Sequence, residues 1–519
     1  MSSKSTASIT GLPQELFDSI TCRMNRADLS SLSRTCRKLR SQTIHLVFEN
    51  VTMLWSGTDK IRKGDDTAGW DDIVTPRTAG WDYIAAERFR EQNPNVLKED
   101  SDVECPRLDL LLRSVLENPH CARLIKTINL QCFRYRTSVK QLEGKPKLPS
   151  RPDTENYRAL VLETMEKVGL DQSKLHEKFK ACLIRENEFD AVIGFLILLC
   201  PNVTSLTLGL DVLINNPFLN FVFQECTSRF QNLEDITLGA SLEDNTSDLA
   251  RIPSRYKSTK GMILSQTSYL ALFSLPRLKQ AELPIPFLLE NKEEQELAWP
   301  GYVPPSFSPI GTLDLPVSSI RPRLLQKVLQ LTPNITRLEY HWRPWYGLGT
   351  TIPRNCEELA SALMCVKHSL KHFRFELCEW SDIAPGVGEE GEFTSNPDYE
   401  YTIGRCSLKG LTKLESAIMP SCVLLGWHNH TALIDVLPAS LTTLCLADDC
   451  WTYDTWQKDE DSLMLLLQQF FSENWKECLP RLREISVAYE DWEKDDIVSL
   501  LRENGIRCQI LPSNEPSCV

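Results

Sequence analysis

Three acidic residues occupy equivalent places in one recurring sequence pattern. The pattern is an apolar residue, two variable residues and then apolar-variable-apolar, and Glu282, Asp314 and Glu339 are the central residues of three successive copies. In an apolar-variable-apolar triplet the outer side chains face a core and the central one faces away from it. If neighbouring copies form adjacent strands, the three carboxylates form a stripe. Such a stripe suits a basic protein segment, because opposite charges steer the encounter.

The residues next to this stripe add further charge and an aromatic ring that could anchor a partner. The candidate surface for binding a partner, or client, protein consists of Glu282, Asp314, Glu339, His341, Trp342, Arg374 and Glu376. The alternative is a solvated strand surface, because acidic residues are common in a chain of net charge -13.

Other spacings that could do chemistry carry less weight. Residues 386–391 fit GxGxxG, but no strand pattern precedes them, and Glu389 and Glu390 stand where a pyrophosphate would have to lie. His368 and His372 have the spacing of a helical zinc pair, but they straddle a junction between helix and strand. No Ser/His/Asp or Cys/His spacing marks a nucleophile. We therefore expect no catalytic residues, no metal site and no cofactor.

The elements that must position these residues are short strands in a long array. Ten copies of the pattern begin at residues 125, 203, 233, 278, 310, 335, 370, 414, 441 and 482. Amphipathic segments at 189–199, 324–331, 359–366 and 463–471 would supply returning helices. One such unit cannot bury its apolar face alone, whereas stacked units share a continuous core. The sequence therefore predicts an α/β solenoid with a parallel sheet on its concave side.

This array resembles a leucine-rich-repeat horseshoe. The copies lie 25 to 78 residues apart, whereas regular repeats have about 20 to 29 residues, so insertions must interrupt the array. We place them at 133–188, with helices at 157–168 and 172–182, and at 381–401.

The N-terminal segment predicts three short helices within about forty residues. Pro13 stands in a first helical turn, and Leu16, Ile20 and Met24 follow at intervals of four. Asp28 is expected to cap the second helix and Ser33 the third. Residues 10–50 resemble an F-box without a gap, and the segment 48–52 resembles the strand that often follows F-boxes in fungal proteins.

The resemblance implies that these helices dock onto a Skp-type adaptor, which links the chain to a cullin scaffold and to ubiquitin transfer. The adaptor contacts carried over from the motif are Leu12, Pro13, Leu16, Ile20, Leu29, Leu32, Cys36 and Leu39. The alternative is that the same residues only close a small internal core, since amphipathic faces usually do so.

Composition bounds the remaining possibilities. The chain of 519 residues exceeds the size of a single core, and no apolar run approaches the roughly 20 residues of a membrane span. A basic-then-apolar leader is absent and the 18 cysteines contain no CxxC pair, so we expect a cytoplasmic or nuclear protein with reduced thiols. Residues 51–519 carry 66 acidic against 50 basic residues, which disfavours nucleic acid as a partner.

The sequence thus predicts five segments: a flexible N-terminus at 1–9, an F-box module at 10–52, a connector at 53–104, an interrupted solenoid at 105–510 and a tail at 511–519. The resemblance implies the substrate receptor of a Skp-cullin-F-box ubiquitin ligase, with a client on the solenoid. Two alternatives stay open: an adaptor-bound scaffold without a role in degradation, and an enzyme whose site lies in the insertions.

Overall fold

The computed structural model gives the fold in two compact units, residues 1–248 with 253–264 and residues 249–252 with 265–519. It describes residues 14–21, 23–24, 26–55, 107–132, 148, 155–170, 176–186, 188–213, 216–240, 264–285, 299, 305–318, 320–342, 354–377, 402–426, 432–447, 462–488 and 494–511. Most of the expected connector, the first part of the insertion at 133–188, the insertion at 381–401 with its GxGxxG, and residues 512–519 lie outside these ranges.

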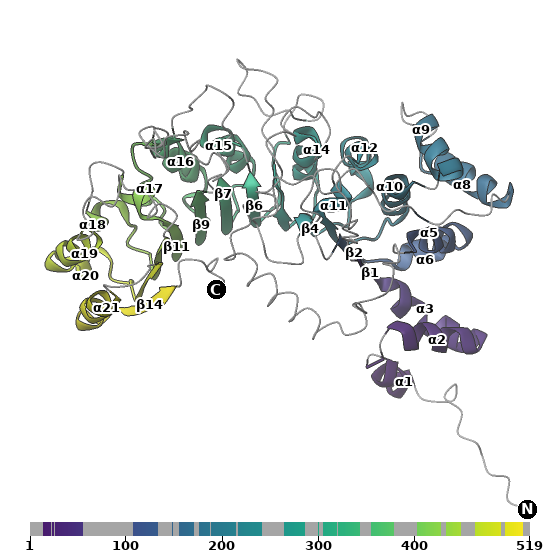
Figure 1. The fold of residues 1–519 in the computed structure, drawn as a ribbon, viewed down its shortest axis with the longest axis horizontal. Coiled ribbons are helices and arrows are strands. Elements are labelled where there is room, and N and C mark those ends of the chain that lie inside the picture. Colours follow the sequence, from purple (N-terminus) through teal and green to yellow (C-terminus); the bar gives the residue numbers. More distant parts are fainter. Residues whose placement is uncertain are drawn as a thin grey trace, which may run out of the picture. The chain divides into compact units, whose positions relative to one another are not determined.

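The first unit opens with three helices, as expected from the sequence, and continues with four strands and their connecting helices (Figure 1). Its strands are β1 (Asn50–Trp55), β2 (Thr127–Cys132), β3 (Ser205–Gly209) and β4 (Asp235–Ala240). Its helices are α1 (Gln14–Thr21), α2 (Arg26–Thr35), α3 (Arg37–Glu49), α5 (Leu108–Glu117), α6 (Pro119–Leu124), α8 (Glu155–Lys167), α9 (His176–Ala181), α10 (Phe189–Leu199), α11 (Leu210–Leu213) and α12 (Pro217–Glu225), with a π-helix at Cys182–Glu186 and a 3₁₀ turn at Thr227–Arg229.

The second unit continues with eight parallel strands, and described helices connect several of them. Its sheet strands are β5 (Gln280–Glu282), β6 (Thr312–Ser318), β7 (Arg337–Trp342), β9 (His372–Leu377), β11 (Ser416–Pro420), β12 (Thr443–Ala447), β13 (Glu484–Ala488) and β14 (Arg507–Leu511), and β8 (Arg354–Asn355) pairs separately with β10 (Thr402–Ile403). Its helices are α14 (Gln266–Ala271), α15 (Pro322–Leu331), α16 (Cys356–Leu363), α17 (Ser421–Leu425), α18 (Leu433–Val436), α19 (Ser462–Ser472), α20 (Trp475–Cys478) and α21 (Lys494–Glu503), with 3₁₀ turns at Leu272–Ser274 and Met364–Val366.

In each unit the strands of the large sheet are parallel and in register, so that equivalent apolar residues form ladders. In the first unit the pairing places Val51 beside Ile128, Ile128 beside Leu206, and Leu206 beside Ile236, all buried. In the second unit an equivalent ladder runs through Ala281, Leu313, Leu338, Phe373, Ala417, Leu444 and Ile485. Nine of the ten predicted triplets lie wholly on parallel strands, and the tenth ends one residue beyond β5, so the predicted α/β solenoid-like fold is confirmed.

The turn that precedes each strand also stacks on the next turn. The backbone N–H of Thr336 donates to the carbonyl oxygen of Gly311 at 2.7 Å, and the N–H of Lys371 donates to that of Thr336 at 2.8 Å. The threonine hydroxyl adds a bond of 3.1 Å to the same Gly311 oxygen. These bonds give the backbone groups of the turns partners, and they help to fix the register of adjacent strands.

Two predicted helix caps were wrong. Helix α2 begins at Arg26, so Asp28 lies in its first turn, and Ser33 lies inside the same helix with its hydroxyl bonded to the Ser30 carbonyl. The cap of α3 is Cys36, whose extended backbone lets its sulfur accept a bond from the N–H of Leu39 at 3.5 Å. Helix α3 then passes into β1 without an intervening residue.

Candidate functional site

Helix α1 has two faces with opposite environments. Phe17 is 1% exposed and Thr21 is buried, with the threonine hydroxyl donating to the Phe17 carbonyl at 3.0 Å. Leu16 and Ile20, also one turn apart, are 55% and 42% exposed. Because residues four apart share a helix face, Phe17 and Thr21 anchor α1 while Leu16 and Ile20 present an apolar edge.

The other expected adaptor contacts are placed differently. Leu29 and Leu39 are buried within the chain. Leu32 is half-buried and Cys36 is exposed. Leu12 and Pro13 lie outside the described residues. The described part of the module therefore offers Leu16, Ile20, Leu32 and Cys36 at or near its surface.

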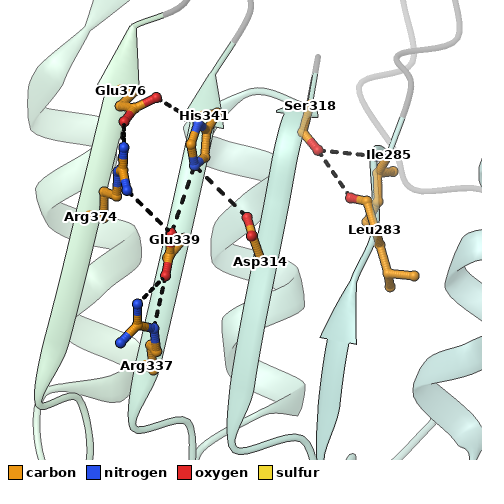
Figure 2. A network of polar contacts seen from close by, with 9 residues as sticks. All are labelled: Leu283, Ile285, Asp314, Ser318, Arg337, Glu339, His341, Arg374 and Glu376. Atoms are coloured by element: carbon orange, nitrogen blue, oxygen red, sulfur yellow. Dashed lines mark hydrogen bonds and ion pairs between the residues drawn. The ribbon is translucent and has the colours of Figure 1, made fainter. Parts of the chain in front are cut away.

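The three acidic residues of the predicted stripe lie side by side. The register pairs Glu282 with Asp314, Asp314 with Glu339, and Glu339 with Arg374 on the neighbouring strand β9. Figure 2 shows the side chains of Asp314, Glu339 and Arg374 on the face of the sheet that is turned away from the helices behind it. Ser318 secures this part of β6, because its hydroxyl accepts from the Ile285 N–H at 3.0 Å and donates to the Leu283 carbonyl at 3.3 Å.

His341 lies at the centre of these carboxylates. It follows Glu339 by two residues and therefore shares its face of β7. Its Nδ1 is 2.7 Å from Oε2 of Glu376, and its Nε2 is 3.9 Å from both Asp314 Oδ1 and Glu339 Oε2. We name Asp314, Glu339, His341 and Glu376 the carboxylate–histidine cluster (Figure 2).

Two arginines border the carboxylate–histidine cluster. Arg337 lies with its Nε 2.8 Å from Glu339 Oε1. Arg374 donates from Nε to Glu376 Oε1 at 2.6 Å, and its Nη1 is 4.0 Å from Glu339 Oε2. The cations therefore hold the outer oxygens of Glu339 and Glu376.

The pKa values of the Asp314, Glu339 and Glu376 carboxyl groups are shifted in different directions by their surroundings. Burial raises the pKa of Asp314 to about 7, and the nearby charges of Glu282 and Glu339 add to the rise against the opposing effect of His341. The neighbouring His341 side chain lowers the pKa of Glu339 to about 2, with help from Arg337. Burial acts to raise the pKa of Glu376, but His341 and Arg374 outweigh it and the net shift is downward.

Trp342 does not flank the stripe as the sequence suggested. It alternates onto the same face of β7 as Tyr340, its ring stacks on the Tyr340 ring at a centroid distance of 6.5 Å, and it is buried. The expected aromatic edge is therefore part of the core. Of the seven expected client contacts, the structure brings Glu282, Asp314, Glu339, His341, Arg374 and Glu376 together on one face.

Across the part of the chain that the structure describes, no helix combines the length and the apolarity needed to cross a bilayer.

Comparisons with known proteins say more about the N-terminal helices than about the repeat units. No curated protein sequence matches the chain. The chain is similar in structure to a chain of the solved structure described as "Crystal structure of Rad7 and Elc1 complex in yeast", with 12% sequence identity, a TM-score of 0.22, and coverage of 80% of this chain and 90% of that one. A TM-score this low carries no argument about function.

The family comparison concerns the N-terminal helices. Residues 9–48 match the F-box domain family, and the matched segment contains α1, α2 and most of α3. The buried Phe17, Leu29 and Leu39 explain how so short a segment closes on itself, and Leu16 and Ile20 stay outside that core. Residues 9–48 of this chain are therefore an F-box domain.

Proposed function

We propose that this chain is the substrate receptor of a Skp-cullin-F-box ubiquitin ligase. The F-box domain binds a Skp-type adaptor, and the repeat units bind a client protein. The observation that carries the proposal is the exposed pair Leu16 and Ile20 beside the buried Phe17. Burying two such side chains against a partner contributes about 3 to 6 kcal/mol before the costs of association.

In this proposal the chain makes and breaks no bonds itself. It acts in the cytoplasm or nucleus, where a cullin scaffold carries the ubiquitin-transferring machinery. Holding adaptor and client on one chain raises the effective concentration of the client near that machinery. The continuous passage from α3 into β1 supports the proposal, because it joins the F-box domain to the first strand without a linker.

Adaptor binding is tested by co-purifying the full-length chain with a Skp-type adaptor. The double variant Leu16→Asp/Ile20→Asp should lose the adaptor. The matched control is Leu465→Asp, because Leu465 is 56% exposed against 55% for Leu16 and lies on α19 in the other unit. If the double variant keeps its circular dichroism spectrum and still binds like the wild type, the docking proposal is wrong.

For the client we propose the face that carries the carboxylate–histidine cluster and Glu282. Its carboxylates suit a segment containing Lys or Arg. The probe is a fluorescent lysine-rich peptide, and Asp314→Lys/Glu339→Lys should abolish its binding while adaptor binding stays. The matched control, Glu117→Lys/Glu163→Lys, makes the same charge change on exposed helix positions. If both double variants lose peptide binding to the same extent, the loss comes from overall charge and not from this face.

A further inference from the structure

Two neighbouring strands bring a mixed set of metal-ligating atoms together. Asp314 on β6 and Glu339 and His341 on β7 can each offer one ligand atom, and these three atoms lie within 4.8 Å of one another. Among the residues that the structure describes, this is the one group of three His, Cys, Asp or Glu side chains whose ligand atoms lie this close together. The backbone pairing of Asp314 with Glu339 fixes the positions from which the side chains extend.

The histidine is oriented as metal-ligating histidines usually are. Its Nδ1 lies 2.7 Å from Oε2 of Glu376, a carboxylate partner of the kind that ligating histidines have, and its Nε2 is on the side of Asp314 and Glu339. The side chain is only 6% exposed, and its Nε2 is directed between Asp314 and Glu339, 3.9 Å from an oxygen of each. These separations exceed hydrogen-bond length.

Asp314 gives the second, independent observation. Its Oδ1 is buried and makes no hydrogen bond to any residue that the structure describes. A buried carboxylate oxygen without a donor is costly, and an ion that coordinates it removes that cost.

We propose that Asp314, Glu339 and His341 bind a divalent cation of the zinc type. Zinc accepts one imidazole nitrogen and two carboxylate oxygens at about 2.0 to 2.2 Å, which places tetrahedral ligand atoms about 3.4 Å apart. The two observed separations of 3.9 Å therefore close by about half an ångström on binding. Three protein ligands leave a fourth tetrahedral position for water or another ligand. Glu376 is a positioning residue for His341 and not a ligand.

The opposing interpretation needs no metal. A protonated His341 could itself hold Asp314, Glu339 and Glu376 as an internal ion network. The two interpretations differ in a direct measurement, because only the first requires a 1:1 complex with Zn²⁺. The proposal does not rest on client or adaptor binding, so it is tested on the chain without either partner.

The test is calorimetric titration of the chelator-treated full-length chain with Zn²⁺, with Mg²⁺ as the ion that should not bind. Asp314→Asn and His341→Gln should each weaken Zn²⁺ binding about tenfold or more, because each removes a ligand. Glu282→Gln is the matched control: it neutralises a carboxylate on the neighbouring strand but removes no ligand, and should change the affinity less than about threefold.

Two readouts on the wild-type chain do not depend on whether a variant folds. Excess Zn²⁺ should raise its melting temperature, because a ligand that binds only the folded state stabilises it. Co²⁺ should give the visible absorption of a low-symmetry site with nitrogen and oxygen ligands. Absence of both signals, or equal weakening by Asp314→Asn, His341→Gln and Glu282→Gln, would overturn the proposal and assign the network to a protonated His341.

Discussion

Nδ1 of His341 lies 2.7 Å from Oε2 of Glu376, and the two residues are register partners on the adjacent strands β7 and β9. The backbone pairing thus places an acceptor directly beside the imidazole. Because a side chain with one fixed partner loses its freedom to rotate, His341 presents Nε2 toward Asp314 and Glu339.

The first prediction concerns this pair. Glu376→Gln should weaken Zn²⁺ binding by about tenfold, since losing the second partner of a ligating histidine typically costs 10- to 100-fold in metal affinity. The measurement is the same calorimetric titration. Glu484→Gln on β13 is the control, because it removes a half-buried strand carboxylate that faces Arg507 and not the carboxylate–histidine cluster. If Glu376→Gln binds Zn²⁺ with unchanged affinity, Glu376 does not position His341.

The second prediction links the cation to the client. Zn²⁺ and a basic peptide draw on the same carboxylates, so saturating Zn²⁺ should weaken binding of the lysine-rich peptide. The change is measured by fluorescence anisotropy with and without a chelator. In His341→Gln the peptide affinity should no longer respond to Zn²⁺. If Zn²⁺ leaves the peptide affinity of the wild-type chain unchanged, the two ligands occupy separate surfaces.

The third prediction separates the two faces of α1. Phe17→Ala should destabilise the F-box domain by about 3 to 5 kcal/mol, whereas Leu16→Ala should change its stability by no more than about 0.5 kcal/mol. Hydrogen exchange of α2 and α3 in the full-length chain measures both effects. Protection that falls equally in the two variants would mean that Leu16 belongs to the core.

The fourth prediction concerns the thiols. Burial raises the pKa of Cys200 to about 12 and that of Cys226 to about 11, which leaves both thiols protonated at neutral pH. Cys478 is exposed. Because the thiolate is the nucleophile, iodoacetamide should label Cys478 well before either buried thiol, and all three in denaturant. Peptide mass spectrometry follows the order, and early labelling of Cys200 in the folded chain would contradict it.

The repeat architecture could be predicted from the sequence because it rests on apolar side chains at a fixed period. Helix α10 spans Phe189–Leu199, as the apolar run indicated. The caps could not be predicted in the same way. Asp28, Ser33 and Cys36 all lie near the ends of α2 and α3, and the choice among them depends on backbone angles.

The carboxylate–histidine cluster was predicted in part. The triplet alternation placed Asp314 beside Glu339, but it could not show which side chains would touch. The same alternation contained two signals that were missed. Glu339 and His341 lie two apart and share a face, whereas Trp342 lies two from Tyr340 and so belongs to the core. Predicting that Glu376 lies beside His341 requires the register of β7 and β9, in which residues 35 positions apart in the sequence are partners.

Helix α3 ends at Glu49 and β1 begins at Asn50. One added residue at this boundary would turn the helix by about 100° and would also invert every side chain of a strand whose inward residues are already set by Ile128 and its neighbours. The rotation of α3 relative to the faces of β1 is therefore fixed. Lengthening this junction by even a single peptide unit would therefore force either α3 or β1 out of its observed place.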